Sequence, residues 1–577
     1  MKTFGEVSAD KLRGGFYTPP ALVRRCLDRV AELVGDRQSL AVLEPSAGDG
    51  AFIRGLREHP LARRVDRLTA IELVPEEAAR CRAEAAAARF ASEVIAGSVL
   101  ARGASGLARG ASGLAHGGTA LAHGGPAPAH GDRAGARFDI ATGNPPFVRF
   151  QFVGDGDRRA AAALADDLGV SFAGVSNLWI PVLLAALGAL RDGGAFAFIV
   201  PAEILTGISA DVARRWLAGR ASPLQLDLFP VGSYPGVLQE VVIVSGLVAS
   251  PASPGPPASP PRLLLAEHGP AGQARRWQHV IAAGSRTWTG YLLEPAHLGA
   301  LEEARSLKSV RTVGDLARFE VATVTGANGF FTVAEETLGA YQLSQWALPL
   351  LPRTRHATGL EFTEDDYALL RESGRRAHLL SFSADRPAPA GALARAYLRH
   401  GEQAALPDRY KCRIRAPWYR VPVAAPGQIM MSKRAHRYPR LILNRAGVHT
   451  TDTIYRGRML PGADRTAADL VAAFHSSLTL LTAEIEGRSF GGGVLELVPT
   501  EAGRLLAVVP ERFGDEVERL DLLARAGSGA DGEALIEETG RLLAKSTAGL
   551  TASLLDTLRD ARLLLLARRM ARNAPAR

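Results

Sequence analysis

Phe138-Asp-Ile-Ala-Thr-Gly-Asn-Pro-Pro-Phe147 places an apolar strand directly before the tetrapeptide Asn144-Pro-Pro-Phe147. The two prolines stiffen the turn, so the Asn144 side-chain oxygen and the Pro145 carbonyl can converge on one small donor. An exocyclic amine has two N–H bonds that need acceptors, and a nucleobase outside its helix needs an aromatic platform such as Phe147. Although Asn-Pro is also common in plain surface turns, the stretch indicates group transfer to an amine nitrogen.

Upstream of this stretch, the sequence predicts a strand, a glycine turn and a helix in direct succession. The strand is Leu40-Ala-Val-Leu-Glu44, the turn is Pro45-Ser-Ala-Gly-Asp-Gly50, and the helix runs from Ala51 to Arg57. Gly48 and Gly50 allow the backbone to approach a ligand closely, and the start of the helix presents free N–H groups. The pattern is typical of a nucleoside-binding turn in a doubly wound α/β fold.

One more strand and an N-terminal segment complete the pattern. An apolar run from Arg67 to Ile71 ends in Glu72, whose carboxylate suits the two hydroxyls of a ribose. With Gly15-Phe-Tyr-Thr-Pro-Pro20 and an expected helix from Ala21 to Leu33, the order of motifs resembles the class I S-adenosylmethionine-dependent methyltransferases. It is most similar to the gamma-class DNA amino-methyltransferases with an Asn-Pro-Pro-Tyr/Phe motif, mostly N6-adenine enzymes of restriction-modification systems. The resemblance implies an α/β fold with a doubly wound, Rossmann-like sheet.

The resemblance also implies a role for individual residues. S-adenosylmethionine would be the methyl donor, bound by Tyr17, Thr18, Pro19, Glu44, Ala47, Gly48, Gly50, Glu72, Ser98 and Asn144. Asn144, Pro145, Pro146 and Phe147 would be the catalytic motif. Phe147 and Tyr234 would stack on the two faces of the flipped base, with Phe229 as second choice for the latter role. The family usually has an acid where this chain has Ser98, but a hydroxyl can still hydrogen-bond the cofactor adenine.

A repeat interrupts these motifs. Ala101-Arg-Gly-Ala-Ser-Gly-Leu107 recurs as Ala108 to Leu114 and then degenerates up to about residue 135. The seven-residue units are rich in Gly and lack a strong apolar pair, so the sequence predicts a flexible surface insertion rather than a coiled coil. His116, His123 and His130 share the same spacing, but a flexible repeat provides no fixed geometry, and we expect no metal site.

Length and composition indicate a cytoplasmic protein of two or three domains. The 577 residues exceed what one hydrophobic core usually supports. No apolar run approaches the roughly 20 residues of a membrane span, and Met1 to Arg13 lack the apolar core of a signal peptide. Cys26, Cys81 and Cys412 are widely separated, which suits a reducing compartment and ordinary packing.

Positive charge is concentrated in one segment. From Arg409 to Arg458 there are twelve Lys or Arg and one acid, Asp452, so this segment carries +11 while the whole chain carries +9. Prolines and interleaved aromatics indicate short strands and loops rather than a solvated helix face. Because Lys and Arg neutralise phosphates and aromatics can stack or wedge into the gap left by a flipped base, we expect a nucleic-acid groove.

The same segment resembles the target-recognition domain of longer gamma-class enzymes, in Tyr410-Lys-Cys-Arg-Ile-Arg-Ala-Pro-Trp-Tyr419 and Leu443-Asn-Arg-Ala-Gly-Val-His-Thr-Thr-Asp452. The resemblance implies double-stranded DNA as the partner. The residues expected to contact DNA are Lys411, Arg413, Arg415, Trp418, Tyr419, Lys433, Arg434 and Arg437. We expect a catalytic domain at 1–295 that includes the insertion at 101–135, a mixed α+β recognition domain at 296–510, and a helical extension at 511–577.

Other interpretations remain open. Release-factor glutamine and ribosomal RNA guanine methyltransferases share an Asn-Pro-Pro-aromatic motif, but neither accounts for the basic segment. A DNA-binding subunit could retain the fold as an inactive scaffold, although the intact glycine turn and Asn144 argue against it. The favoured interpretation is a monomeric, site-specific enzyme that methylates N6 of a flipped adenine. Any cognate restriction endonuclease would be a separate chain. The preference for adenine over cytosine rests on the resemblance alone.

Overall fold

The chain divides into two compact units between Pro295 and Ala296, which we call the first and the second unit. The computed structural model describes residues 18–110, 138–229, 240–249, 260–269, 273–383, 385–386, 389–490, 492–527 and 532–571. Several expectations lie outside the described residues, namely those for Tyr17, Tyr234, residues 111–135 of the insertion, and His116, His123 and His130.

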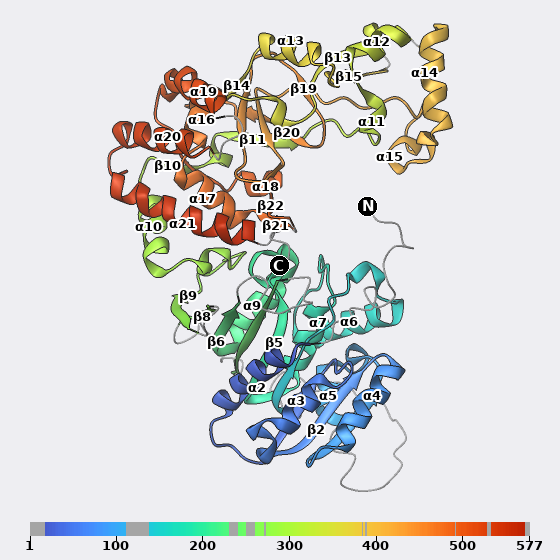
Figure 1. Ribbon diagram of the computed structural model, residues 1–577, viewed down its shortest axis with the longest axis vertical. Coiled ribbons are helices and arrows are strands. Elements are labelled where there is room, and N and C mark those ends of the chain that lie inside the picture. The colour runs from blue at the N-terminus through green and yellow to red at the C-terminus, as the bar shows by residue number, and fades with distance from the viewer. Residues whose placement is uncertain are drawn as a thin grey trace. The chain divides into compact units, whose positions relative to one another are not determined.

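A nine-stranded sheet forms the centre of the first unit (Figure 1). In chain order its strands are β1 (Leu40–Glu44), β2 (Val65–Glu72), β3 (Ala91–Ala96), β4 (Phe138–Gly143), β5 (Leu190–Pro201), β6 (Ala221–Leu228), β7 (Val241–Val248), β8 (Arg262–His268) and β9 (Ala274–Val280). Across the sheet they lie in the order β3-β2-β1-β4-β5-β7-β6-β8-β9. Neighbours are parallel except at β5–β7, β6–β7 and β8–β9. The predicted Rossmann-like α/β fold is confirmed.

Helices cover this sheet, as its apolar faces require. They are α2 (Pro20–Val34), α3 (Ala51–Glu58), α4 (Pro75–Ala86), α5 (Val99–Gly110), α6 (Asp155–Leu168), α7 (Trp179–Gly188), α8 (Glu203–Thr206) and α9 (Asp211–Arg220). Residues of α2, α3 and α4 share one hydrophobic core with alternate strand residues such as Val42 and Ile140. Helix α7 packs on β5 and contacts α5 and α6, so its described side chains are buried from Trp179 to Leu187. A helix that is apolar all round belongs in such a position.

The two strands that carry the key motifs are buried along their whole length. Every residue of β1 and of β4 is buried, as expected for central parallel strands that are covered on both faces. They pair directly, with Val42 opposite Ile140. The apolar sequence from Asn177 to Leu190 predicts one helical run, but α7 ends at Gly188 and Leu190 already begins β5.

The repeat insertion begins as a helix rather than as the expected flexible loop. Helix α5 extends over Val99–Gly110, with a break at Gly103, where φ is 61° and ψ is 169°. Leu107, the last residue of the first repeat unit, is buried. One leucine in seven residues is therefore enough to hold the first unit of the repeat on the fold, which its glycine content did not indicate.

Small sheets and helices build the second unit. The five-stranded sheet has the order β11-β20-β16-β18-β14, the four-stranded sheet β12-β15-β13-β19, the three-stranded sheet β17-β22-β21, and β10 pairs with β23. The strands are β10 (Val310–Thr312), β11 (Ala317–Val321), β12 (Thr332–Val333), β13 (Ala347–Leu351), β14 (Glu361–Phe362), β15 (His378–Leu380), β16 (Ile429–Ser432), β17 (Arg434–Ala435), β18 (Leu441–Asn444), β19 (His449–Thr450), β20 (Ile454–Met459), β21 (Arg488–Phe490), β22 (Val494–Glu496) and β23 (Leu506–Val508).

Helices occur throughout this unit, and the three at its C-terminal end follow one another with no strand among the described residues between them. They are α10 (Pro295–Ser306), α11 (Asn328–Phe331), α12 (Glu335–Tyr341), α13 (Glu364–Glu372), α14 (Ala392–Gln403), α15 (Tyr410–Arg413), α16 (Ala467–Phe474), α17 (Ser477–Glu486), α18 (Pro499–Ala502), α19 (Val517–Ala526), α20 (Glu533–Ser546) and α21 (Ala552–Ala571). The predicted combination of a mixed α+β region and a helical tail is confirmed.

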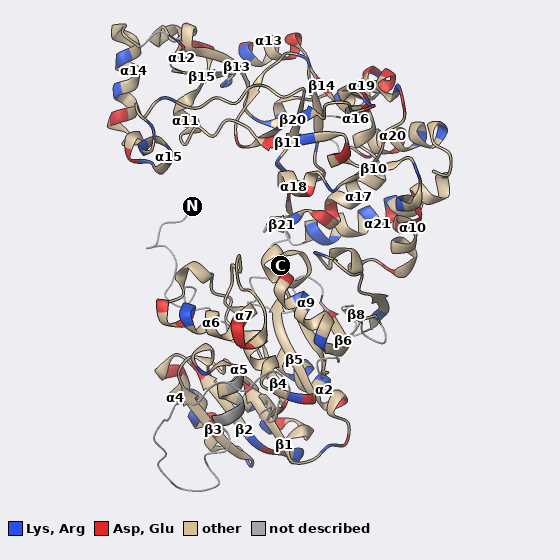
Figure 2. Cartoon of the chain, turned by 180° about the vertical axis from the view of Figure 1, so that it is seen from behind, with Lys and Arg blue, Asp and Glu red and all other residues tan. Residues whose placement is uncertain are grey.

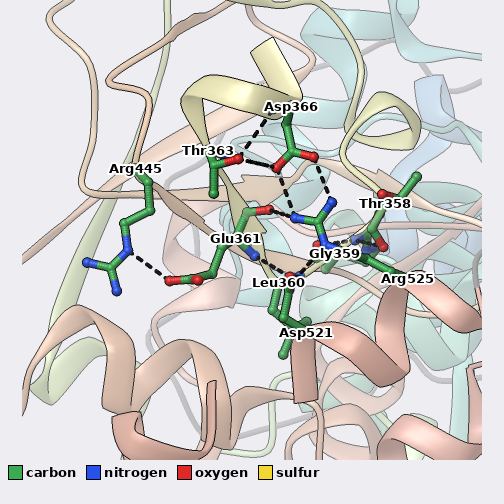
Figure 3. Close-up of polar contacts among 10 residues, drawn as sticks. Thr358, Gly359, Leu360, Glu361, Thr363, Asp366, Arg445, Asp521 and Arg525 are labelled. Atoms are coloured by element: carbon green, nitrogen blue, oxygen red, sulfur yellow. Dashed lines mark hydrogen bonds and ion pairs between the residues drawn. The ribbon is translucent and has the colours of Figure 1, made fainter. Parts of the chain in front are cut away.

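Charged side chains fasten the C-terminal helices to the small sheets. Arg525 of α19 donates to both carboxylate oxygens of Asp366 at 2.6 and 2.9 Å and to Asp521 at 2.6 Å (Figure 3). Asp521 in turn accepts from the backbone N–H groups of Leu360 and Glu361 at 2.6 and 3.0 Å. The helical tail is therefore an integral part of the second unit rather than an appendage.

Candidate active site

The candidate site lies where the strand order of the first unit reverses, between β1 and β4. In an open α/β sheet the crevice at the carboxyl ends of strands on either side of such a reversal is the usual ligand site. Glu44 ends β1, Gly143 ends β4 and Glu72 ends β2, so the sheet brings the three predicted motifs to one edge. The sequence alone gave their order but not this adjacency.

The glycine turn after β1 has the backbone that only glycine adopts readily. Gly48 has φ of 55° and Gly50 has φ of 85°, both in the left-handed region. A Cβ atom on Gly50 would lie 3.2 Å from the Glu84 Cβ and 3.3 Å from the Cys81 Cα. Helix α3 begins directly after Gly50 and no side chain caps its N-terminus. The turn therefore packs closely against α4, and the uncapped N-terminus of α3 directly after it can offer N–H groups to a ligand.

Glu72 holds the turn in place. Its Oε2 accepts from the Gly48 N–H at 2.8 Å and its Oε1 accepts from the Val74 N–H at 2.8 Å. Each carboxylate oxygen has further lone pairs, so the carboxylate can still accept from a ligand hydroxyl. Glu72 thus combines a structural role, which the sequence did not indicate, with the position expected for a ribose-binding carboxylate.

Glu44 is a buried carboxyl group with an unused oxygen. Its side chain is 1% exposed, and its Oε2 has no hydrogen-bond partner among the described residues. Burial raises the pKa of Glu44 well above its usual value, and the negative charges of Asp49 and Glu72 raise it further. Such a group favours a ligand that brings a hydrogen-bond donor or a positive charge.

Asn144 is held so that its side-chain oxygen stays available. Its Nδ2 donates to the Thr18 Oγ1 at 3.2 Å, and its backbone carbonyl accepts from the Ser46 Oγ at 3.2 Å. The Asn144 Oδ1 is buried and has no partner among the described residues. No donor within the described part of the chain reaches the Pro145 carbonyl either. Two acceptors next to each other therefore await a donor, which is what an exocyclic amine offers.

Of the aromatic residues predicted to stack on the base, the structure describes Phe147 and Phe229 but not Tyr234. Phe147 is half-buried and packs against the core shared by α2, α3 and the sheet. Phe229, the second choice, stacks on the His268 ring with centroids 5.1 Å apart. Because Phe229 already has this stacking partner, its ring is less available to a base than the sequence suggested.

The remaining predicted cofactor residues surround the turn. Ala47 is buried and its N–H donates to the Ile71 carbonyl at 2.9 Å, which joins the turn to β2. Pro19 is the residue before α2. Ser98 is half-buried and directly precedes α5.

Sequence reasoning missed two residues at this site. The hydroxyl of Ser46 joins the turn after β1 to the tetrapeptide after β4. Asp49 forms an ion pair with Arg54 at 3.1 Å and adds to the negative charge around Glu44. Both lie inside the glycine turn, so their polar side chains were visible in the sequence, but their partners were not.

The predicted DNA-contacting residues divide into two groups. Lys411 and Arg413 lie on α15 and are exposed. Arg415 instead donates to the backbone carbonyls of Thr325 and Val324 at 2.7 and 2.8 Å, and Trp418 packs in an aromatic cluster, 5.5 Å from the Phe330 ring. The latter two therefore have structural roles in this unit.

A similar division holds for the remaining members. Tyr419 packs beside Trp418 and Phe382, with ring centroids at 5.7 and 5.6 Å, and Arg434 pairs with Glu496. Lys433 is half-buried and Arg437 is exposed. Figure 2 shows Lys and Arg interspersed with Asp and Glu over the second unit. Some of the positive charge of the segment is therefore used within the unit, by Arg434 and Arg415, and is not free to contact DNA.

Other classes of site receive no support from the described residues. Within the described ranges no three or more His, Cys, Asp or Glu side chains are grouped as metal ligands. In the same ranges, no helix combines the length and the apolar composition that crossing a bilayer needs. All three cysteines are buried and unpaired, and burial raises the pKa of Cys81 to about 12, so they are packing residues as predicted.

Comparison with known proteins identifies the second part of the chain. Residues 285–541 match the family model of the Type II methyltransferase M.Eco57I, C-terminal domain. The match passes through residue 510 without a break and includes α19 and part of α20. The expected resemblance to methyltransferases of restriction-modification type is thereby confirmed for this part.

Solved structures give weaker likenesses. The type IIG restriction endonuclease BpuSI is 14% identical with a TM-score of 0.40, over 96% of this chain and 66% of that one. A DrdV–DNA complex is 11% identical with a TM-score of 0.48, over 89% and 58%. A putative class I S-adenosylmethionine-dependent methyltransferase from Listeria monocytogenes is 14% identical with a TM-score of 0.31, over 44% and 66%. This chain thus spans 66% or less of the length of each.

Proposed function

Since residues 285–541 match the family model of the Type II methyltransferase M.Eco57I, C-terminal domain, we propose that this chain is a DNA methyltransferase of restriction-modification type. It transfers a methyl group from S-adenosylmethionine to the N6 amine of an adenine flipped out of double-stranded DNA. The observation that carries the proposal is the buried, unpartnered Asn144 Oδ1 beside the Pro145 carbonyl. Both acceptors suit the two N–H bonds of one exocyclic amine.

The residues of the cofactor pocket fit a cationic nucleoside. Glu72 and the Gly48 turn provide a carboxylate and close backbone approach at the switch point. Glu44 supplies a buried acceptor in a negatively charged surrounding, which favours the ammonium and sulfonium groups of S-adenosylmethionine. When bound, this molecule supplies an activated methyl group on sulfur, so the protein needs to supply no strong base.

The chemical work of the chain is positioning. The Asn144 Oδ1 and the Pro145 carbonyl accept hydrogen bonds from the two N–H groups of the amine, which directs the nitrogen lone pair toward the methyl group, and one amine proton is released to water after the transfer. Phe147 stacks on the flipped base and excludes water from one side. Holding the two reactants in line accounts for much of the acceleration in such a bimolecular transfer.

The recognition role is assigned to the second unit, with duplex DNA as its partner. A monomer is sufficient, because both predicted parts are carried by one chain. An RNA guanine substrate and an inactive scaffold that only binds DNA are the alternatives that the following experiment separates.

Sequencing of genomic DNA from cells that express the chain, with single-molecule detection of modified bases, tests the proposal. Expression of Asn144→Ala provides the matched control. N6-methyladenine at one short motif with the wild type, and its absence with Asn144→Ala, is the expected result. Calorimetry should show that the variant still binds S-adenosylmethionine. Methylated RNA in place of DNA, or an unmodified genome from a well-expressed wild type, would refute the proposal.

A further inference from the structure

Two large apolar side chains are exposed on the second unit, within the part of the sequence that is richest in Lys and Arg. Tyr410 is 64% exposed and Ile414 is 61% exposed. Tyr410 begins the short helix α15 (Tyr410–Arg413), and Ile414 is the residue directly after its end. Among the exposed large hydrophobic residues in the described parts of the chain, no other two lie so close in sequence. Burying such a pair requires a partner.

The turn that carries this pair is anchored from below. Cys412 is fully buried in the core of the second unit. A Cβ atom on Gly326 would lie 2.7 Å from the Lys411 Cβ, so the backbone just before α11 packs closely against α15. Arg415 ties the end of the turn to the carbonyls of Val324 and Thr325. The two apolar side chains are therefore presented from a rigid base.

Unpaired cations surround the pair. Arg409, Lys411, Arg413 and Arg420 are exposed, and none forms an ion pair with another described residue. The Lys411 Nζ lies 5.4 Å from the centre of the Tyr410 ring. Between residues 404 and 425 the one acid is Asp408. This local excess of positive charge contrasts with Arg434, Arg445 and Arg456, which pair with glutamates.

We infer that Tyr410 and Ile414 form an apolar wedge that enters the base stack of duplex DNA, with the surrounding cations on the phosphates. The inference rests on the proposed function and makes it more specific. Cations at the rim supply affinity for a polyanion, whereas exposed aromatic and aliphatic side chains fill the space between separated bases. The sequence predicted Trp418 and Tyr419 as DNA contacts, but both pack within the aromatic cluster.

The test compares wedge and rim variants in binding to a fluorescent duplex. The variants are Tyr410→Ala, Ile414→Ala and Lys411→Ala, with Leu369→Ala as control, because Leu369 is 65% exposed in the same unit, on α13. Anisotropy gives the affinity at several salt concentrations, and 2-aminopurine within the duplex reports unstacking. Full-length protein is used throughout.

Tyr410→Ala should lower the affinity about tenfold, equivalent to about 1.4 kcal/mol, and within the range for one stacked base. It should also lose the 2-aminopurine signal while the slope of log affinity against log salt stays unchanged. Lys411→Ala should reduce that slope by about one, and Leu369→Ala should change neither quantity.

The two proposals fail in distinguishable ways. If the wild type binds DNA and Tyr410→Ala matches it in affinity and fluorescence, the wedge is refuted while the methyltransferase proposal stands. If the wild type methylates DNA and Leu369→Ala weakens binding as much as Tyr410→Ala, the wedge is again refuted. If the wild type neither binds nor methylates DNA, the proposed function itself fails.

Discussion

Replacing Thr18 by Val tests how the catalytic amide is oriented. Thr18 Oγ1 accepts from the Asn144 Nδ2 at 3.2 Å, and this contact turns the Asn144 Oδ1 toward the site. Valine keeps the shape of threonine but removes the acceptor, so the amide loses the partner that distinguishes its two ends. Thr18 was expected to line the cofactor, whereas the structure gives its hydroxyl to Asn144.

The expected magnitude follows from one hydrogen bond. A neutral hydrogen bond contributes a net of about 0.5–1.5 kcal/mol. If that amount is lost from the arrangement that accepts the amine, the rate of methyl transfer falls about 2- to 13-fold, at about 1.36 kcal/mol for each factor of ten. Thr18→Ser retains the hydroxyl and should restore most of the rate.

Single-turnover transfer of a labelled methyl group to DNA measures the rate, and calorimetry measures the affinity for S-adenosylmethionine. We expect Thr18→Val to slow transfer while the affinity changes less than about twofold. A variant with an unchanged rate and a weakened affinity would show that the hydroxyl acts on the cofactor instead, and the orientation argument would be wrong.

Three further outcomes are expected. The pKa of Glu44 is raised in the folded protein, so the unfolded chain ionises at a lower pH than the folded one, and Glu44 lowers the stability increasingly as the pH rises above about 4.3, the unfolded pKa. Glu44→Gln should therefore raise the unfolding temperature more at pH 8 than at pH 5. Equal shifts at the two pH values would contradict this. Gly50→Ala should weaken S-adenosylmethionine binding and lower the unfolding temperature, both measured by calorimetry. The added Cβ would lie 3.2 Å from the Glu84 Cβ, and the left-handed backbone would cost about 1 kcal/mol more. Gly169→Ala, which has φ of 65° and ψ of 37° and open space around the added Cβ, should show the strain alone. Arg525→Ala should destabilise the second unit by about 2 kcal/mol, or roughly 4–8 °C, because it strands Asp366 and Asp521. Burial alone would raise the pKa of Asp366, but hydrogen bonds from Arg525 hold it below its usual value. The stability that this ion pair contributes is therefore present above about pH 4 and is lost on further acidification. An Arg525→Ala variant as heat-stable as the wild type at pH 7 would refute the role of this ion pair.

Local structure was readable from the sequence because it depends on neighbouring residues. The apolar run Leu40–Glu44, bounded by polar residues and a glycine turn, could only be a short buried strand, and the structure has those bounds. The same reasoning predicted the strand before Asn144 and the helix after Gly50. Where a boundary depended on packing, as at Leu190, the prediction placed the residue in the wrong element.

The candidate site residues were proposed from the sequence, whereas their interactions could not be predicted from it. The residue types and order of the glycine turn, Glu72 and the tetrapeptide indicated an α/β ligand site, because their chemistry belongs to the side chains themselves. The contact between Thr18 and Asn144 spans 126 residues, and that between Ser46 and Asn144 spans 98. No local pattern encodes such pairs.

The basic segment shows the same limit for charge. The sequence determined that Arg409–Arg458 carries a large positive excess, since charge is a sum over residues. Only the tertiary structure decided that Arg415 binds backbone carbonyls and Arg434 pairs with Glu496, while Lys411 and Arg413 remain exposed. The reason is physical: whether a guanidinium faces solvent or a partner depends on which distant carbonyls and carboxylates the fold brings within hydrogen-bonding distance.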